Sequence, residues 1–516
     1  MQDVRTWPNV SWGAYVQDDW RATNRLTLNL GLRWDGIPHA YEVNNLMGNF
    51  YPSLYDPSKA AIMLPNGTID PASPGLGTSP NSVLAGVPLY LNGIGLEGKG
   101  GVPKGLVNNH WATFGPRFGF AYDLTGSGKT VVRGGFSIMY ERIQGNDMYN
   151  AGPNIPFSLN VGTNAVELQN PNIKLATGTA PPLPINAANI TGLALNNYKP
   201  TASTQYSAGV QHSFGPKTVL SVSYVGNMNR HLNDYRETNL PSLSDLAVID
   251  APGSSLQWQS ASSLPYKGFR SLSLAQNEAT GHYNSLQVDL NSQATRDLQL
   301  RAYYTLSRSI DPSTGGSGQD LNAVTNPYVG WRYDLGPSLF DRTHNFSANF
   351  IYSIPVLRNS SSRMLKSTLG GWQVSGIVTI ESGLPINVNG GSSVVVGNGN
   401  RPDLTGKISY MHKVLPGNEK IQYFDPTAFT ATAPGVWGNL GHNALRGPGR
   451  DNWNLSVFKT FAITEASGFQ LRLETFNTFN HTQFQGVSTG LGDSRFGQFT
   501  SAYPARIVQL SGKVYF

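Results

Sequence analysis

Residues 508–516 at the end of the chain read VQLSGKVYF, and their alternation points to a class of fold. Apolar residues and one glycine occupy every second position, while Gln509, Ser511 and Lys513 occupy the positions between them. Successive side chains of a β-strand point to opposite faces of the sheet. The stretch therefore predicts a strand that has one apolar face and one polar face and that ends in an aromatic residue, Phe516.

The same alternation recurs along the whole chain. Residues 25–35 alternate leucine and tryptophan with polar residues or glycine, and residues 285–291, 297–306 and 469–475 repeat the pattern. No segment shows a convincing helical period. We predict about thirteen strands, most of them close to the 9–11 residues that cross a bilayer when tilted. The predicted strands are residues 11–21, 25–35, 112–123, 129–142, 203–213, 217–229, 285–291, 297–306, 344–354, 371–381, 452–461, 469–475 and the 508–516 stretch.

Composition narrows the class of protein. Charged residues make up 13% of the 516 residues, against about 25% in ordinary soluble domains. The many aromatic residues argue against disorder, and the absence of cysteine excludes disulfides and thiolate chemistry. The formal charge is +6, but lysine and arginine are scattered, so no nucleic-acid partner is predicted. No apolar run reaches the roughly 18 residues of a membrane helix, although strands of a membrane barrel give a much weaker signal.

The connections between the predicted strands alternate between short and long. Short turns lie at Ala22–Asn24, Thr125–Gly128, Gly215–Pro216, Ala294–Arg296 and Thr464–Ser467, and a longer turn covers 355–369. The long segments, rich in Gly, Pro, Asn and Ser, are 37–111, 143–202, 231–281, 311–342, 383–450 and 479–503. Structureless loops of this length are uncommon in compact soluble domains, whereas outer-membrane barrels have short periplasmic turns and long extracellular loops. The pattern favours a membrane barrel over a soluble β-sandwich, barrel or propeller.

Aromatic residues fall near both ends of the predicted strands, as expected for the two girdles that frame the lipid-facing band of a barrel. Tyr122, Phe214, Tyr352, Trp372 and Phe516 fall at the short-turn ends, and Tyr140, Tyr304 and Trp453 fall toward the long-loop ends. Two girdles at the strand ends agree with strands that cross a bilayer.

The strand count predicts where the chain ends lie. The C-terminus of such a barrel is periplasmic, so counting back through thirteen strands places residue 1 on the extracellular side. Complete bacterial barrels have an even number of strands. An odd number with an external N-terminus predicts that residues 1–516 are the C-terminal portion of a larger barrel, and the lack of a signal peptide in residues 1–10 agrees.

Four stretches resemble one family. The sequences WGAYVQDDWRATNRLTLNLGLRWD (12–35) and FGPRFGFAYDLTGSGKTVVRGGFSIMYER (114–142) resemble hairpins of TonB-dependent receptor barrels. The sequences LRGPGRDNWNLSVFKTF (445–461) and LRLETFNTFNHTQF (471–484) are similar to the Oar-like branch of TonB-dependent transporters. The resemblance follows the strands across most of the chain and is weak in the loops.

The resemblance implies a barrel of about twenty-two strands with a plug inside it and often a carboxypeptidase-regulatory-like domain before the plug. Neither the plug, nor that domain, nor an energy-coupling box is found in residues 1–516. The implied function is that of an outer-membrane receptor that binds a bulky ligand with its external loops and imports it with energy from a TonB-type partner in the inner membrane. A non-transporting adhesin or structural barrel is the alternative. An enzyme is not predicted, and no cofactor is expected.

The C-terminal strand also resembles the signal by which bacterial outer-membrane barrels are recognised for assembly. The residues expected to carry it, read by the barrel assembly machinery, are Val508, Leu510, Val514 and Phe516. We expect Leu28, Leu300, Leu471 and Leu510 to point outward into outer-membrane lipid. The candidate polar residues of the lumen are Arg33, Arg133, Arg301, Arg472 and Glu474.

No catalytic or metal-binding constellation is predicted. Residues 126–130, GSGKT, resemble the end of a phosphate-binding loop, but Asp123 stands where that motif needs glycine and a strand pattern follows instead of a helix. A tight hairpin turn is the better interpretation. The nine histidines are dispersed without the spacing of a zinc site.

Overall fold

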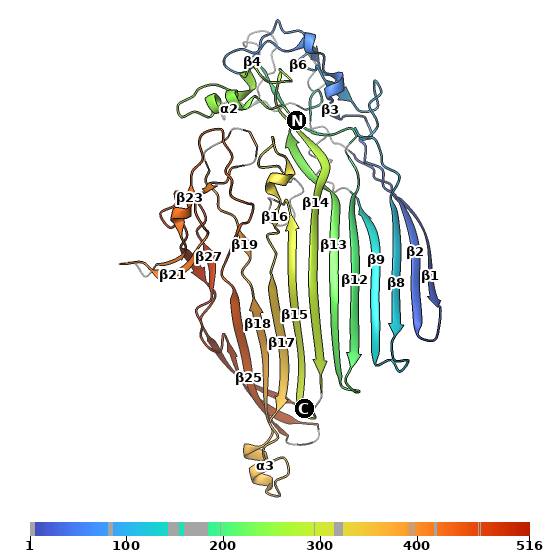
Figure 1. Ribbon diagram of the computed structural model, residues 1–516, viewed down its shortest axis with the longest axis vertical. Coiled ribbons are helices and arrows are strands. Elements are labelled where there is room, and N and C mark those ends of the chain that lie inside the picture. The colour runs from blue at the N-terminus through green and yellow to red at the C-terminus, as the bar shows by residue number, and fades with distance from the viewer. Residues whose placement is uncertain are drawn as a thin grey trace.

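The structure is a computed structural model that describes residues 6–516, apart from 81–85, 143–153, 159–183, 197, 294, 314–322, 392–393, 395, 398, 417–419, 463 and 465. One large curved sheet dominates it, and loops crowd one end of that sheet (Figure 1). The strands on the main path, in spatial order, are β1 (Trp12–Arg21), β2 (Leu26–Gly36), β8 (Phe114–Asp123), β9 (Thr130–Glu141), β12 (Thr201–Ser213), β13 (Thr218–Glu237), β14 (Phe269–Ser292), β15 (Leu298–Asp311), β17 (His344–Ser353), β18 (Trp372–Glu381), β25 (Arg450–Ala462), β26 (Gly468–Phe476) and β29 (Ile507–Tyr515). Every predicted strand is therefore present, and each pairs antiparallel with its neighbours on this path.

The register of the sheet separates an apolar face from a polar face. One row of directly opposed residues crosses nine strands and consists of Leu26, Tyr122, Val132, Val210, Val222, Val288, Tyr304, Phe346 and Ile380. The adjacent row, one residue along each strand, consists of Arg133, Gly209, Ser223, Gln287, Thr305, Asn345 and Glu381. Because adjacent rows lie on opposite faces, one face of the sheet suits lipid and the other suits water.

The predicted outward leucines share the apolar face. Leu300 stands opposite Phe350, and Leu510 stands opposite Leu473. Leu28 stands opposite Phe120, in a row that leads across the sheet to Leu306, and Leu471 lies two residues before Leu473. The period-two pattern of the sequence thus predicted the face of each leucine correctly.

The two ends of the sheet differ as predicted. The hairpins β1–β2, β8–β9, β12–β13, β14–β15 and β25–β26 turn at one end, and the long loops gather at the other (Figure 1). β1 descends from the loop end and β29 ends at the turn end. Within the described residues, β1 pairs only with β2 and β29 only with β26, so the sheet has two free edges.

Two strands are much longer than predicted. β13 has 20 residues and β14 has 24, whereas the sequence predicted strands only at 217–229 and 285–291. Their upper parts fall in residues 231–281, which were predicted to form a loop. β11 (Ala188–Leu193) pairs parallel with the upper part of β14, so the sheet is not purely antiparallel. These upper parts leave the period-two pattern because loops, rather than lipid, cover them.

The long segments that were predicted to be loops contain small sheets and short helices. The paired loop strands are β3 (Gly48–Phe50) with β7 (Ile94–Leu96), β4 (Thr68–Ile69) with β10 (Ile185–Asn186), β5 (Leu76–Thr78) with β6 (Pro88–Tyr90), β16 (Gly336–Pro337) with β15, β19 (Pro385–Ile386) with β24 (Leu445–Arg446), β20 (Asp403–Leu404) with β23 (Phe429–Thr430), β21 (Tyr410–Val414) with β22 (Ile421–Phe424), and β27 (Phe484–Val487) with β28 (Phe499–Ala502). The helices in the part of the chain that the structure describes are α2 (Leu243–Ile249) and α3 (Arg363–Leu369), and the short 3-10 turns there are η1 (Pro52–Leu54), η2 (Pro57–Lys59), η4 (Trp258–Ser260), η5 (Trp331–Asp334) and η6 (Pro426–Ala428).

The two α-helices among the described residues begin at a serine cap, which the helical-period search could not reveal. The hydroxyls of Ser242 and Ser362 accept hydrogen bonds from the backbone of the first turns of α2 and α3. Each helix has only seven residues, too few for a hydrophobic period to show. α3 lies at the short-turn end (Figure 1), where the Lys459 ammonium donates to the Thr368 carbonyl oxygen at 2.6 Å.

The buried apolar cores lie among the loops and against the upper part of β14, at the loop end of the main sheet. One core joins Phe50, Tyr90 and Ile155 to Phe269 and Leu272 of β14. A separate core joins Val388, Phe424 and Phe429 to Phe496, and it packs the small sheets of residues 385–445 and 484–502 together. The described loops therefore form folded bodies with their own interiors, and the wall beneath them exposes its apolar face.

Candidate functional site

The candidate lumen residues all lie on the polar face, but they are spread over four strands. Arg33 is on β2, Arg133 on β9, Arg301 on β15, and Arg472 and Glu474 on β26. Only the last two meet, with 3.3 Å between Arg472 Nη1 and Glu474 Oε1. The structure therefore places these residues along a polar wall and does not gather them into one pocket.

Several of these arginines pair with neighbours on their own or the adjacent strand. Arg33 Nε lies 2.6 Å from Asp35 Oδ1, and Arg301 Nη2 lies 3.5 Å from Asp289 Oδ2. Arg301 also stacks over the Tyr303 ring at 4.7 Å. Because these side chains are partly exposed, solvent screens the ion pairs and each adds little stability. Their expected place in a lumen, paired with polar groups of a plug and with water, stays a prediction.

The predicted assembly residues form an exposed edge. Val508, Leu510 and Val514 are 59%, 71% and 64% exposed, and Phe516 is fully exposed. Because these side chains touch so little of the described protein, packing alone gives no reason for their apolar character. Their role in assembly stays a prediction.

The GSGKT sequence is a hairpin turn, as predicted. It joins β8 to β9, and Asp123 Oδ1 and Oδ2 accept hydrogen bonds from the backbone N–H groups of Gly126 and Gly128 at 3.0 and 2.7 Å. The Asp123 carboxylate thus accepts hydrogen bonds from backbone N–H groups of the kind that bind the phosphate in a phosphate-binding loop. Elsewhere in the described residues, no three or more His, Cys, Asp or Glu side chains come together in a way that could hold a metal ion. The helices that the structure describes include none long and apolar enough to cross a membrane.

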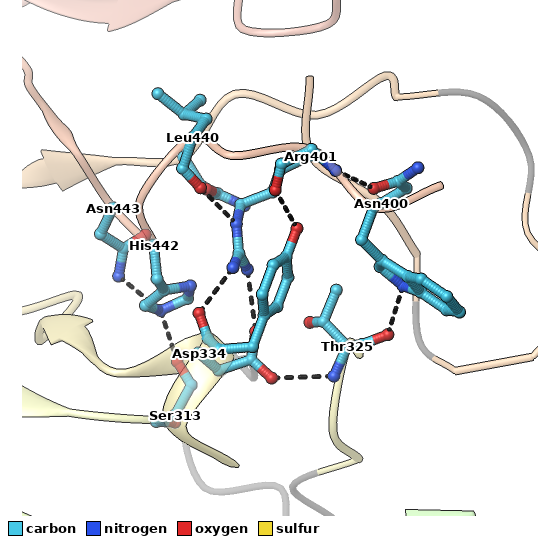
Figure 2. Close-up of polar contacts among 12 residues, drawn as sticks. Ser313, Thr325, Asp334, Asn400, Arg401, Leu440, His442 and Asn443 are labelled. Carbon is cyan, nitrogen blue, oxygen red and sulfur yellow. Dashed lines mark hydrogen bonds and ion pairs between the residues drawn. The ribbon is translucent and has the colours of Figure 1, made fainter. Parts of the chain in front are cut away.

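The most developed polar site lies in the loops above β15, β17 and β18, and it is centred on a buried ion pair (Figure 2). Arg401 Nη1 lies 2.8 Å from Asp334 Oδ1, and the two side chains are only 3% and 2% exposed. The remaining guanidinium nitrogens donate to the carbonyl oxygens of Leu440 at 2.9 Å and Tyr333 at 2.6 Å. The other carboxylate oxygen of Asp334 accepts from the Thr325 backbone N–H at 2.8 Å. Each charge is thus paired and hydrogen-bonded, as a buried charge requires.

Aromatic side chains complete this site, which we call the loop lock: Thr325, Tyr333, Asp334, Arg401, Trp437 and Leu440. The Arg401 guanidinium lies 3.9 Å from the centre of the Tyr333 ring. The Trp437 indole N–H donates to the Thr325 carbonyl oxygen at 2.9 Å, and the Tyr333 hydroxyl donates to the Gly438 carbonyl oxygen at 2.6 Å. These bonds all join the loop after β15 to the loop after β18.

Further contacts extend the connection between the same two loops. Arg446 forms an ion pair with Asp341, which is 2% exposed, and also donates to the Asp341 carbonyl oxygen at 2.9 Å. His442 Nε2 donates to the Ser313 carbonyl oxygen at 3.1 Å (Figure 2). Burial and then the nearby Arg401 charge lower the pKa of His442 below its ordinary value, so this imidazole is neutral near pH 7. The arrangement offers rigidity and shape; it contains no nucleophile with a base beside it.

Sequence reasoning missed the loop lock. Asp334 and Arg401 are 67 positions apart, and no periodic pattern or motif spacing links them. The only signal in the sequence was compositional. Charged residues are scarce in this chain, so a charged residue within a Gly- and Pro-rich loop is a candidate for a structural ion pair.

Comparisons with known proteins identify the family. Residues 2–509 match the family model described as the outer membrane beta barrel domain. No curated protein matches the chain. Solved structures to which the chain is similar include an outer membrane transporter, YddB, from Escherichia coli, with 10% identity, a TM-score of 0.44, and coverage of 98% of this chain and 45% of that one.

Two further solved structures are similar to the same degree. The siderophore receptor PiuA from Acinetobacter baumannii has 11% identity, a TM-score of 0.42, and coverage of 98% of this chain and 43% of that one. The ferric-catecholate import receptor Fiu from Escherichia coli K12 has 11% identity, a TM-score of 0.39, and coverage of 98% and 44%. The chain spans less than half the length of these solved proteins.

The family agrees with the strand count, the register and the loop placement that the structure shows. It is a family of membrane barrels and not of enzymes. The predicted outer-membrane β-barrel fold and the outer-membrane location are thereby confirmed, while the Oar-like branch stays a prediction. Because the family model covers residues 2–509, the chain belongs to the outer membrane beta barrel domain family and is a protein of the bacterial outer membrane.

Proposed function

We propose that this chain is the C-terminal portion of a receptor barrel that binds a bulky ligand with its extracellular loops and carries it across the outer membrane. The observation that carries the proposal is the loop lock, together with the buried cores around it. Ordering loops costs conformational entropy, and a preorganised surface binds more tightly because that cost has already been met on folding. A fully buried ion pair within the long loops is best explained by a surface that must keep its shape.

The free edges of the sheet support the proposal that the chain is part of a larger barrel. β1 and β29 each leave one side of the backbone without a strand partner among the described residues. Unpaired backbone groups in lipid cost several kcal/mol each. We therefore propose that further strands close the barrel between β29 and β1, and that a plug fills the lumen against the polar face. Energy for import would come from a TonB-type partner acting through parts outside residues 1–516.

A non-transporting adhesin is the second candidate, because a rigid outer surface serves adhesion equally well. The test uses the full-length protein in its own cells, with uptake of compounds from spent medium measured in the wild type, a deletion strain and a strain without the energy-coupling partner. Import predicts that both deletions abolish uptake of the same compound, while surface binding persists without the coupling partner. Unchanged uptake in both strains, with loss of surface attachment in the first, would refute transport and favour adhesion.

A further inference from the structure

A cavity lies outside the loop lock, at the upper rim of β25. Its volume is about 390 Å³, and its walls include His412, Tyr423, Asp451, His481 and Phe484. His412 and Tyr423 come from the β21–β22 hairpin, which projects from the side of the molecule (Figure 1). Asp451 comes from β25, and Phe484 begins β27. The cavity therefore lies between the barrel wall and an overhanging hairpin.

The register places the wall side of this cavity on the lipid-facing side of the barrel. Asp451 stands opposite Ile380, the last member of the apolar row. The Trp453 indole N–H donates to Asp451 Oδ1 at 2.9 Å, which keeps both side chains on that face. Phe479 packs against Trp453 with ring centres 5.7 Å apart, and His481 stacks on Phe479 at 5.8 Å.

These rings lie where the upper membrane boundary is expected. Aromatic side chains of a barrel collect where lipid meets water, and Trp453 and Phe479 lie on the apolar face at the loop end. The cavity opens immediately above them. The surrounding medium at that level is the headgroup layer of the outer leaflet.

The opposite wall of the cavity is a rigid aromatic surface. Phe484 lies parallel to Phe499, with ring centres 3.9 Å apart and an angle of 7°. Phe499 also contacts Tyr423 at 4.8 Å and His412 at 5.6 Å. The Tyr423 hydroxyl donates to the Arg446 carbonyl oxygen at 2.9 Å, so its ring orientation is fixed.

We infer that this cavity binds a neutral sugar ring. One face of a pyranose carries only C–H groups and packs on an aromatic surface, while the hydroxyls at its edge need donors and acceptors, as in pockets that combine apolar walls with a few polar groups. Asp451, His412 and His481 supply those polar groups. The lining contains a carboxylate and neither lysine nor arginine, which disfavours a phosphorylated or carboxylated ligand. The inference does not depend on transport.

The sugar has two sources, a glycolipid of the outer leaflet or a soluble oligosaccharide, and one experiment separates them. The full-length protein is placed in nanodiscs that contain phospholipid alone, lipid A, or lipopolysaccharide with its core sugars. Saturation-transfer NMR then measures transfer from protein to sugar C–H protons, with free core oligosaccharide added to the phospholipid discs. Transfer to one ring face is expected. Equal transfer from the free oligosaccharide identifies a soluble source, and transfer only in lipopolysaccharide discs identifies the membrane.

Exposed side chains provide variants that leave the fold intact. His412→Ala combined with His481→Ala should weaken binding at least tenfold, and Asp451→Asn should weaken it less because the amide still accepts a hydrogen bond. His110→Ala removes an exposed histidine elsewhere and serves as the matched control. The shift in gel mobility on heating, which folded barrels show, checks each variant for folding. Binding that is equal in wild type and double variant, or absent for every sugar-bearing probe, would overturn the inference.

Discussion

Replacing Arg401 with methionine should loosen two extracellular loops and leave the barrel wall folded. The substitution keeps most of the side-chain volume and leaves the 2%-exposed Asp334 carboxylate without its ion-pair partner. Removing one partner of a buried pair costs about 3–5 kcal/mol, because the remaining charge is desolvated and uncompensated. The hydrogen bonds to the Leu440 and Tyr333 carbonyl oxygens are lost as well. The sheet beneath keeps all of its ladders, since neither residue belongs to β17 or β18.

Hydrogen–deuterium exchange of the protein in nanodiscs measures this change. Peptides from residues 323–341 and 437–446 should exchange about two to four orders of magnitude faster in the variant, since each 1.4 kcal/mol is a factor of ten. Peptides from β17 and β18 should exchange as in the wild type. This pattern would localise the stabilisation to the loops.

Two further variants make the reasoning refutable. The double variant R401M/D334N should recover part of the lost protection, because no buried charge remains. The control variant Arg358→Met breaks the exposed pair with Asp297 at the opposite end of the sheet and should not change exchange in either loop. Acceleration of less than tenfold in R401M, or equal loss of protection in β17 and β18, would show that the loop lock does not hold the loops as argued.

A buried histidine in the loops, the lipid-facing side of β29 and the C-terminal residue give three further predictions. Burial lowers the pKa of His39 from 6.5 to about 4, so between these pH values the unfolded loop binds a proton that the folded loop excludes. The stability of the loop is complete above about pH 6.5 and falls by about 3 kcal/mol as the pH drops toward 4. Hydrogen–deuterium exchange of the 39–50 segment in wild type and His39→Phe measures this loss, and an equal pH dependence in both proteins would contradict the assignment to His39. Leu510→Lys should cost about 2–4 kcal/mol of folding free energy in vesicles if that site faces mid-bilayer lipid, whereas Gln509→Lys on the opposite face should cost much less. Equal costs for the two variants would show that the face carrying Leu510 does not face lipid. Deleting Phe516 from the full-length protein should lower the amount in the outer membrane and leave ligand affinity of the assembled fraction unchanged, and an unaltered membrane yield would remove the proposed assembly role.

The wall of the barrel was predictable from sequence because its signal is local. A strand between lipid and water must alternate, and residues 26–34 or 298–306 show this without any knowledge of their partners. The face of Leu300 followed from the same rule. Turn positions followed as well, since short polar segments such as 125–128 separate two alternating runs.

The loops were not predictable because their order depends on distant contacts. Phe50 packs against Phe269 across more than 200 positions, and Asp334 meets Arg401 across 67. The upper parts of β13 and β14 lack alternation because residues such as Leu272 are buried under loops rather than facing lipid. The sequence carries no local sign of such pairings, so strand ends and loop cores had to come from the structure.

The lengths of β13 and β14 have a consequence for how the protein reaches its final topology. At about 3.3 Å per residue, the 24 residues of β14 extend for about 80 Å, roughly three times the height of a lipid-facing band. The upper end of β13 contains Arg230, Asp234, Arg236 and Glu237, which cannot rest in hydrocarbon. These charges therefore hold the upper part of β13 outside the hydrocarbon, and they oppose any sliding of β13 and the paired β14 toward the periplasm.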